Sequence, residues 1–230
     1  MNYPNLQLVV VNDGTPAEKA KQFQRLSAKL SKRGHIFFSQ SNGGPSKARN
    51  TAAALAKHKT LVFFDADNLP KLNFLNDLAR GLEMSSYDSI SAPYFICENL
   101  DVPIEKILTD SVYQPAGGFL PASLLKNYLG DTCSIIRRST FEAIGGFPED
   151  RRAFEDWHFF FRLIAAGYKH SVYPEPLFYY RVHPDSRSAL WNREDGYMQF
   201  YQNISEMPRT ELEFALRVLS EQKLKDFGYY

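Results

Sequence analysis

Residues 61–70 read LVFFDADNLP, an apolar run that ends in two aspartates separated by one alanine. Apolar residues at 61–64 that are followed by turn residues are typical of a strand buried in a sheet. Residues two apart in a strand point to the same side, so Asp65 and Asp67 are expected to project together beyond the buried run. This pair of carboxylates predicts a site for Mg²⁺ or Mn²⁺, which keeps positions open for phosphate oxygens. On these residues alone, a polar turn before the next helix is an equally good interpretation.

Strands and helices alternate on both sides of this run. The predicted strands are residues 6–12, 35–39, 61–64 and 89–96, and the helices between them are residues 15–33, 47–57 and 72–84. Such alternation indicates βαβ units and a parallel sheet, with ligands bound at the carboxyl ends of the strands. The first part of the chain therefore predicts an α/β fold.

The second part of the chain is less regular. Residues 98–130 contain several prolines and glycines and are expected to form an irregular segment. The predicted elements that follow are strands at 132–137, 171–173 and 177–182, helices at 139–144 and 155–166, and a polar helical tail from residue 192. The length of 230 residues suits one α/β domain with a substantial core and is short for two.

Composition excludes several classes of protein. The net charge of +1 gives no broad basic field of the kind that holds nucleic acid. Two cysteines without metal-type spacing argue against a disulfide scaffold and favour a reducing, cytoplasmic compartment. No apolar run approaches the roughly 20 residues of a membrane helix. Peripheral association with a membrane is left open.

Six motifs occur in an order that is typical of one protein family. They are VVVNDGT at 9–15, SNGGPSKARNTA at 41–52, FFDAD at 63–67, GGFPE at 145–149, FEDWHFFFRLIAAGYK at 154–169 and YYRVHPDS at 179–186. Over about residues 6–188 the chain resembles the family 2 glycosyltransferases of the GT-A fold. No single motif carries this identification, but the ordered set is quite specific.

The resemblance implies a fold and an activity. The fold is the nucleotide-diphospho-sugar transferase fold, a mainly parallel sheet with helices on both faces. Within one domain, about residues 6–95 would bind the nucleotide sugar, residues 96–190 the acceptor and the catalytic groups, and residues 191–230 form a helical tail. The activity is a metal-dependent inverting transfer of a sugar from a nucleoside-diphosphate donor, expected to be UDP-linked, to a saccharide, lipid-linked or cell-surface glycan acceptor.

Donor-binding residues follow from the same resemblance. Asp13 matches the acid that hydrogen-bonds the nucleobase, and Arg49 can serve the base or the diphosphate. The full set implied for the donor is Asn12, Asp13, Gly43, Gly44, Arg49, Asn50, Asp65 and Arg187. The residues themselves leave alternatives open, because Asp13 also suits a helix cap and residues 41–50 also suit a turn before a solvated helix.

Metal-binding residues are implied at two places in the chain. Asp67 is expected to contact Mn²⁺ or Mg²⁺ directly, and Asp65 to contact the ribose or a metal-bound water. His183, with Arg181 and Arg187, matches a region that closes over the metal and the diphosphate in related enzymes. A lone histidine in a loop is more often an ordinary surface residue.

The catalytic residues implied by the resemblance are Glu155 and Asp156. Asp156 matches the general base of inverting members, and Glu155 would orient it or bind the acceptor. The helix macrodipole favours carboxylates in a first helical turn and would by itself explain both residues.

Two further interpretations compete with the transferase. A haloacid-dehalogenase-type phosphotransferase also places D-x-D after an apolar strand, although this chain has Leu69 where that family has threonine or valine. The second competing interpretation is a catalytically inactive module that binds a nucleotide. The family usually begins with one more strand and helix before the strand at 6–12, so the resemblance implies an N-terminally truncated fold, either as a fragment of a longer protein or with a sheet that closes differently.

Overall fold

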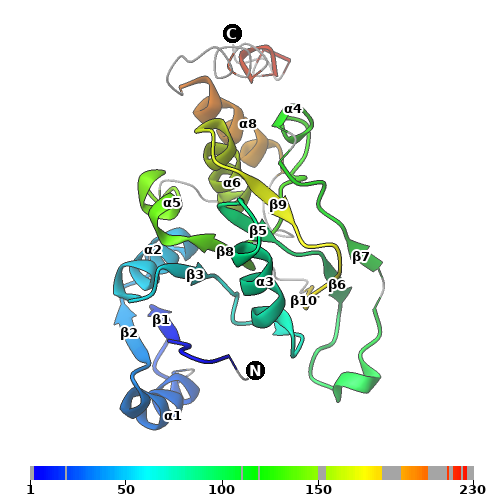
Figure 1. Ribbon diagram of the computed structural model, residues 1–230. Coiled ribbons are helices and arrows are strands. Elements are labelled where there is room, and N and C mark those ends of the chain that lie inside the picture. Colours follow the sequence, from blue (N-terminus) through cyan, green and yellow to red (C-terminus); the bar gives the residue numbers. More distant parts are fainter. Residues whose placement is uncertain are drawn as a thin grey trace.

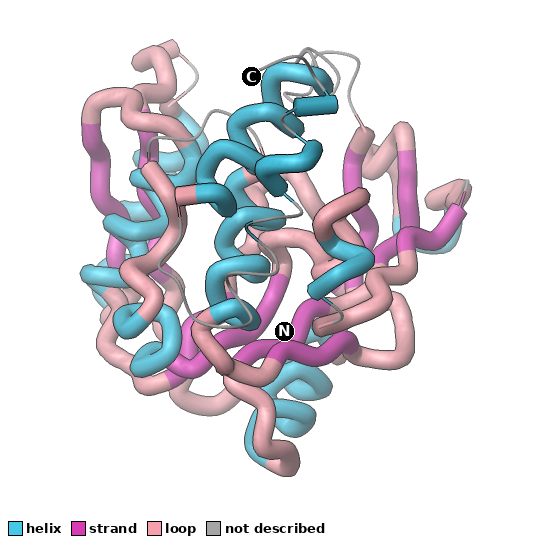
Figure 2. The backbone as a smooth tube through the Cα atoms, turned by 90° about the horizontal axis from the view of Figure 1, so that it is seen from above, coloured by secondary structure: helices cyan, strands magenta, loops and turns pink. Residues whose placement is uncertain are grey.

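The structure is a computed structural model of an α/β protein. It describes residues 3–18, 20–109, 111–118, 120–149, 154–182, 193–206, 217, 220–223, 225 and 226. Helices lie on several sides of the strands in Figure 1, and the view from above also shows helices on more than one side of the strands (Figure 2). The predicted α/β fold class is confirmed. His183 and Arg187, two of the predicted site residues, lie outside the described residues.

The first unit is a parallel pair of strands joined by a helix. Strand β1 (Val9–Asp13) pairs with β2 (Ile36–Gln40), so that Val9 lies opposite Ile36. Helix α1 (Lys21–Leu30) and the 3-10 helix η1 (Ser31–Arg33) connect them, and helix α2 (Pro45–Leu55) follows β2. Helix α1 begins at Lys21 rather than near residue 15, but the order of elements is the predicted one.

The central sheet has the strand order β3-β8-β5-β9. Its strands are β3 (Thr60–Val62), β8 (Ser134–Arg137), β5 (Ser89–Ser91) and β9 (His170–Val172). Strand β8 runs antiparallel to both β3 and β5, whereas β5 and β9 are parallel. The start of β8 therefore lies beside the end of β3.

A third sheet has the order β4-β10-β6-β7. Its strands are β4 (Leu69–Pro70), β10 (Phe178–Arg181), β6 (Tyr94–Cys97) and β7 (Ser111–Tyr113). Only β6 and β10 are parallel in this sheet. The single strand predicted at 89–96 is thus two strands, β5 and β6, which belong to different sheets.

The remaining helices are α3 (Phe74–Glu83), η2 (Ile104–Lys106), α4 (Leu120–Ser123), α5 (Arg138–Ala143), α6 (Glu155–Ala165) and α8 (Arg193–Ser205). Helices α3 and α6 lie on opposite faces of the central sheet. Successive residues of β8 serve opposite faces, as in any strand. Ile135 packs into the cluster under α3, and Ile136 packs into the cluster formed by α6 and α8. Trp157 is 1 % exposed in that second cluster and is therefore a core residue.

The sheets are mixed, which corrects the expectation of a mainly parallel sheet. Among the strand pairings within the described residues, three are parallel and four antiparallel. A parallel neighbour requires a crossover connection, usually a helix, whereas an antiparallel one does not. The irregular residues 98–130 precede β8 and impose no such crossover, so β8 can enter the sheet in the opposite direction.

No helix among the residues that the structure describes is long and apolar enough to cross a membrane. Cys97 and Cys133 are both buried, and neither forms a disulfide bond, which agrees with the prediction from composition that the fold has no disulfide scaffold.

Candidate active site

Acidic side chains meet where β3 ends and β8 begins. Asp65 follows β3, and Asp131 and Cys133 precede β8. A backbone hydrogen bond of 3.1 Å from Phe63 N to Ser134 O continues the antiparallel ladder up to this point. Ligand atoms of Asp65, Asp131 and Cys133 all lie within 4.8 Å of one another. The antiparallel direction of β8 is what brings Asp131 to the same edge as Asp65.

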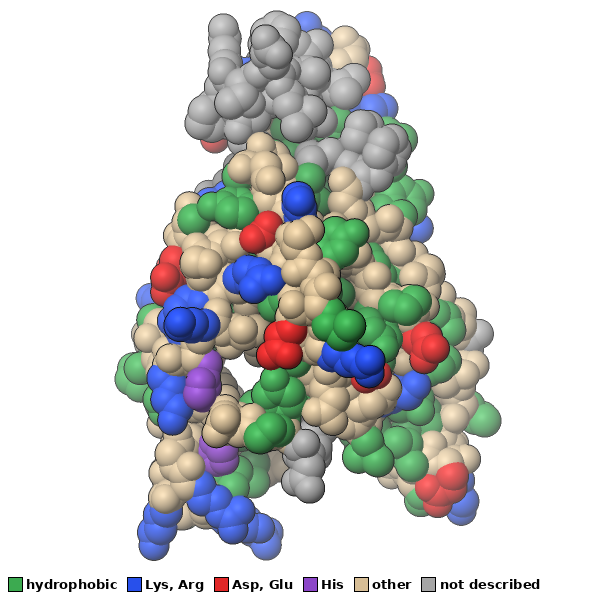
Figure 3. All heavy atoms as spheres, viewed as in Figure 1, with side chains coloured by type: hydrophobic (Ala, Val, Ile, Leu, Met, Phe, Trp, Pro, Cys, Tyr) green, Lys and Arg blue, Asp and Glu red, His purple; other side chains and the backbone are tan. Residues whose placement is uncertain are grey.

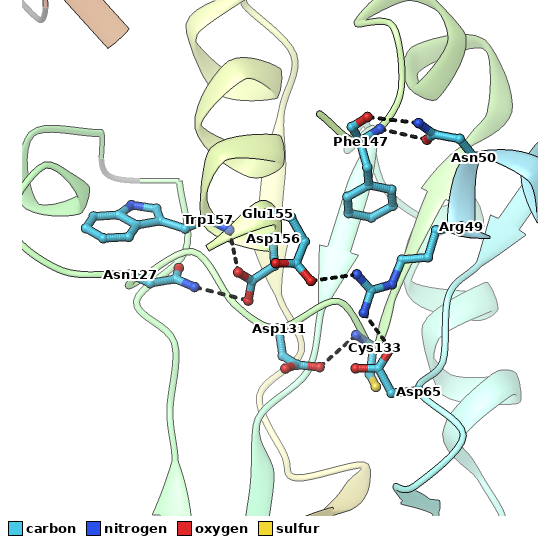
Figure 4. A network of polar contacts seen from close by, with 10 residues as sticks. All are labelled: Arg49, Asn50, Asp65, Asn127, Asp131, Cys133, Phe147, Glu155, Asp156 and Trp157. Atoms are coloured by element: carbon cyan, nitrogen blue, oxygen red, sulfur yellow. Dashed lines mark hydrogen bonds and ion pairs between the residues drawn. The ribbon is translucent and has the colours of Figure 1, made fainter. Parts of the chain in front are cut away.

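Arg49 joins this edge to helix α6. Its guanidinium donates to Asp65 Oδ1 at 2.7 Å and to Glu155 Oε1 at 3.0 Å (Figure 4). The exposed fractions of the three side chains are 15 % for Arg49, 29 % for Asp65 and 12 % for Glu155. Burial lowers the pKa of Arg49 and the two carboxylates raise it by more, so that the net shift is upward and the side chain stays charged. The pairing brings together three residues predicted separately, from α2, β3 and α6.

Asp156 lies in the first turn of α6, directly after Phe154 and Glu155. Its Oδ1 accepts a hydrogen bond of 2.7 Å from Trp157 N, and its Oδ2 accepts one of 3.3 Å from Asn127 Nδ2 (Figure 4). Burial, together with the negative charges of Glu155 and Asp131, raises the pKa of Asp156 to about 8.

Two of the three side chains at this edge, Asp65 and Asp131, are suitable ligands for a hard divalent cation, and Cys133 is not. Asp65 and Asp131 offer carboxylate oxygens, which Mg²⁺ and Mn²⁺ prefer. Burial, followed by the influence of Asp65, raises the pKa of Asp131 to about 6. Burial and Asp131 raise the pKa of the Cys133 thiol well above its usual value, so the thiol stays protonated and is a poor ligand. Asp67, the predicted direct ligand, is exposed and is not a member of this group.

The residues predicted to contact the nucleobase form a second cluster at the end of β1. Asp13 Oδ1 accepts from Gln40 Nε2 at 2.8 Å and from Gly43 N at 2.9 Å, and Asp13 Oδ2 accepts from Gly44 N at 2.9 Å. Asn12 Oδ1 accepts from Thr15 N at 2.9 Å. Helix α1 begins six residues beyond Thr15, at Lys21, and has no side-chain cap, so the interpretation of Asp13 as its cap is wrong.

Asn50 is directed away from these two clusters. Its Nδ2 donates to Phe147 O and its Oδ1 accepts from Phe147 N, each at 2.9 Å (Figure 4). These two bonds attach α2 to the GGFPE motif at 145–149. They place the aromatic ring of Phe147 beneath the guanidinium of Arg49, 5.4 Å from the ring centroid. In this structure Asn50 therefore helps to position Arg49.

Comparison with known proteins settles the family. The sequence model for glycosyl transferase family 2 matches residues 1–145, which is more than half of the chain. The chain belongs to glycosyl transferase family 2. Membership decides against the haloacid-dehalogenase-type phosphotransferase as an interpretation of the two aspartates.

Relatives of this family 2 chain are distant in sequence. An uncharacterized glycosyltransferase of Haemophilus influenzae is 25 % identical over 206 residues, which cover 84 % of this chain and 62 % of that protein. The minor teichoic acid biosynthesis protein GgaB of Bacillus subtilis is 24 % identical over 205 residues, which cover 83 % of this chain and 21 % of GgaB. The chain thus spans less than two thirds of the length of either relative.

Solved structures of glycosyltransferases share the fold. The mannosyltransferase of Pyrobaculum calidifontis, in complex with GDP-Man and Mn²⁺, matches with a TM-score of 0.65 and 18 % identity over 95 % of this chain and 60 % of that chain. Residues 1–349 of TarS of S. aureus, in complex with UDP-GlcNAc, match with a TM-score of 0.63 and 19 % identity over 96 % of this chain and 62 % of that chain. These likenesses confirm the GT-A fold for the family 2 chain.

Sequence reasoning missed two residues of the candidate site, Asn127 and Asp131. Asn127 lies near the end of the segment 98–130 that was expected to be irregular, and Asp131 follows that segment directly. The available signal was a carboxylate one residue before a buried strand, at 132–137. In a parallel sheet that carboxylate would lie at the amino edge, away from Asp65, and so the predicted direction of the strand hid it.

The loop that carries these two residues is held by a buried carbonyl group. Leu129 O accepts hydrogen bonds from Ser91 Oγ at 3.0 Å and from His170 Nε2 at 2.7 Å. Gly130 has φ of +133°, and a side chain there would collide with Ser91. Because His170 Nε2 is the donor, its buried Nδ1 carries no proton, and this atom has no hydrogen-bond partner among the described residues. Burial lowers the pKa of His170 to about 4.

His170 should therefore make stability depend on pH. Its pKa is lower in the folded state than the ordinary 6.5, so the unfolded chain takes up the proton first as the pH falls. The contribution of neutral His170 is complete above pH 6.5 and is lost between pH 6.5 and about 4, by about 3 kcal/mol. Urea unfolding of wild type and His170→Gln at pH 7 and pH 4 should show this loss as a change in the difference between the two proteins.

Ser91→Ala provides the control for this prediction. It removes the other hydrogen bond to Leu129 O without removing a titratable group. The difference in free energy of unfolding between wild type and Ser91→Ala should not change between the two pH values. An equal difference at both pH values for His170→Gln would contradict the assignment of a neutral His170.

Proposed function

We propose that this chain carries the active site of an inverting glycosyltransferase that moves a sugar from a nucleoside-diphosphate donor, UDP-linked, to a hydroxyl of a saccharide or of a lipid-linked or cell-surface glycan. The observation that carries the proposal is Asp156, a partly buried carboxylate with a pKa of about 8 beside the carboxylates that Arg49 joins. A base is most effective when its pKa lies near the working pH, and perturbed carboxylates of this kind gather at active sites.

Asp156 acts as the general base in this mechanism. It takes the proton of the acceptor hydroxyl as that oxygen attacks the anomeric carbon of the donor. The new bond forms on the face opposite the departing diphosphate, so the configuration at that carbon is inverted. Asn127 holds one oxygen of Asp156, and Glu155 is held by Arg49, which leaves the base in a defined orientation.

Mn²⁺ or Mg²⁺ is the cofactor in this proposal. Asp65 and Asp131 would hold it, with Asp67 from the adjoining exposed turn. The cation supplies positive charge to the diphosphate as it leaves. The Mn²⁺ present with GDP-Man in the mannosyltransferase of the same fold supports this assignment.

The donor site is assigned to the cluster at the end of β1. Asp13 would exchange its hydrogen bonds to the glycine turn for contacts with uracil, and Arg49 would face the diphosphate. The UDP-GlcNAc bound to TarS supports UDP, and the name of GgaB supports a cell-surface polymer as acceptor. About residues 6–95 then form the donor half, residues 96–190 the acceptor and catalytic half, and residues 191–230 a helical tail of the same domain.

We assign the sugar transfer to the cytoplasmic side of the membrane. At its inner face the enzyme would meet a lipid-linked acceptor. Cys97 and Cys133, which form no disulfide bond, suit a reducing compartment.

The donor site is tested by thermal unfolding with UDP, GDP and Mn²⁺, alone and in pairs. A ligand at 100 times its dissociation constant adds about 2.7 kcal/mol to the native state. We expect a shift of the melting temperature that needs UDP and Mn²⁺ together and that is greatly reduced in Asp67→Ala. Glu83→Ala, at an exposed position at the end of α3, should keep the full shift.

Other outcomes have defined meanings. A shift with GDP but not UDP would correct the donor base. An undiminished shift in Asp67→Ala would remove Asp67 from the metal site. Binding of UDP and Mn²⁺ without any sugar transfer or donor hydrolysis would favour the inactive nucleotide-binding module.

A further inference from the structure

The charges of this chain are separated along the sequence. Residues 1–64 contain ten lysine and arginine residues and two acidic residues, whereas the other 166 residues contain 17 basic and 24 acidic residues. The overall net charge of +1 hides this separation. A strongly basic part in an otherwise acidic protein is typical of a surface that meets an anionic partner.

Helix α1 concentrates part of this charge in one stripe. Lys21, Arg25 and Lys29 are spaced four residues apart and therefore lie on the same side of the helix, and all three are exposed. Like charges at this spacing destabilise a helix, and neither α1 nor η1 contains an acidic residue that would offset them. Lys32 and Arg33 of η1, also exposed, extend the basic surface beyond the end of α1.

The tertiary structure adds a second basic segment, the loop between α2 and β3. Lys57 N donates to Gln7 Oε1 at 2.8 Å, and Leu8 N donates to His35 Nδ1 at 3.1 Å. These bonds hold the α2–β3 loop and the residues after η1 on either side of the segment before β1. Lys57 and Lys59 are exposed there. We call the seven residues Lys21, Arg25, Lys29, Lys32, Arg33, Lys57 and Lys59 the basic face. In Figure 3 lysine and arginine side chains gather at the lower left, over α1 and the region of α2 and β3.

Exposed leucines lie among these charges. Leu26 of α1 is 41 % exposed, and Leu6 and Leu8, on either side of Gln7, are 42 % and 39 % exposed. A polyanion that binds only through charge has no use for apolar side chains. A bilayer surface accepts both, because basic groups pair with anionic headgroups while leucines enter the boundary with the acyl chains.

The basic face does not obstruct the candidate active site. Its residues at 32, 33, 57 and 59 come before the strands β2 and β3, whereas Asp13 is the last residue of β1 and Asp65 follows β3. The basic face and the site therefore lie at opposite ends of these strands. Contact with a membrane through the basic face leaves the carboxyl ends of the strands accessible.

We propose that the basic face binds the surface of an anionic phospholipid bilayer, with Leu6, Leu8 and Leu26 at its boundary with the acyl chains. Charge gives the initial attraction, which salt weakens, and the leucines add apolar contact. This binding does not depend on the sugar transfer proposed above and can be measured without it.

Cosedimentation with vesicles tests the proposal. The probes are vesicles of phosphatidylcholine alone and vesicles with one third phosphatidylglycerol, at low and at physiological salt. Wild type should bind only the anionic vesicles, and less at higher salt. The triple variant Lys21→Gln, Arg25→Gln, Lys29→Gln should bind about 100-fold more weakly, since each basic residue near such a surface contributes roughly fivefold. Glutamine is nearly as good a helix former as lysine or arginine, so α1 should be retained.

The control removes the same charge elsewhere. Lys106→Gln, Lys169→Gln, Lys225→Gln changes three exposed lysines outside the basic face and should bind vesicles like wild type. Both triple variants should keep the melting temperature of wild type. Equal loss of vesicle binding in the two variants, or no binding by wild type, would overturn the proposal.

A second variant separates a bilayer from a soluble polyanion. Leu26→Gln should weaken binding to anionic vesicles several-fold and leave binding to heparin or polyphosphate unchanged. If wild type instead binds these polyanions more tightly than the vesicles, and Leu26→Gln has no effect on vesicle binding, the basic face is a site for a polyanion and the proposal of a bilayer is wrong.

Discussion

Asp156→Asn is expected to lower kcat for sugar transfer by about 10²–10⁴-fold, the usual contribution of a general base. Asparagine keeps the size of the side chain and can still accept the hydrogen bond from Trp157 N. It has no carboxylate that could take the proton of the acceptor hydroxyl. The measurement is transfer from a UDP-sugar in the presence of Mn²⁺, together with the melting temperature with and without UDP and Mn²⁺. The ligand-induced shift should be retained, because Asp156 belongs to the base and not to the donor cluster.

The pH dependence of the wild type distinguishes a base from a residue that only holds the structure. Because Asp156 must be ionised to act and its pKa is about 8, kcat/KM should rise about tenfold per pH unit below that value and level off above it. A kcat/KM that does not change between pH 6 and pH 8, or near-normal transfer by Asp156→Asn, would end the assignment of Asp156 as the base.

Arg49→Met is expected to destabilise the folded state by about 3 kcal/mol at pH 8. Removing one partner of a buried ion pair costs about 3–5 kcal/mol, and the 29 % exposure of Asp65 argues for the lower end of that range. The variant takes the positive charge of Arg49 away from Asp65 and Glu155, which lie close to Asp131 and Asp156. The measurement is urea unfolding of wild type and variant. The loss should shrink as the pH falls, because the pKa values of these carboxylates rise in the folded state without Arg49 and protonation removes their mutual repulsion.

Arg181→Met is the matched control for this experiment. Arg181 also binds a carboxylate with two nitrogens, at 2.7 and 2.9 Å, but its partner Asp101 is 80 % exposed. Solvent weakens such a pair, and its loss should cost about 1 kcal/mol or less. If Arg49→Met costs no more than Arg181→Met, the bridge between α2, β3 and α6 is not a stabilising part of the fold.

Much of the candidate site could be anticipated residue by residue. The apolar run before Asp65 predicts a strand whose end carries the carboxylate, and the structure places Asp65 at the end of β3. The resemblance to the family also predicted Arg49, Glu155 and Asp156 as site residues, and the fold brings these three residues into one cluster. The predicted role of each remains a proposal, but their proximity is a property of the structure.

Other members of the cluster depend on contacts between distant parts of the chain. Asn127 reaches Asp156 only because the loop after it is held by Ser91 and His170 through Leu129 O. Asn50 was expected to face the donor, and its amide instead binds Phe147, 97 residues away along the chain. Hydrogen bonds of this separation leave no pattern in a single sequence.

The sequence by itself determined the order of the elements, the α/β class and the family, because periodicity, turn residues and motifs are written in short stretches of chain. Only the tertiary structure decided the direction of β8, and with it the place of Asp131 beside Asp65. The physical reason is that a strand is recognised from its own residues, whereas its direction depends on which neighbouring strand supplies hydrogen-bond partners. After an irregular segment of some 30 residues, the local sequence does not contain that information.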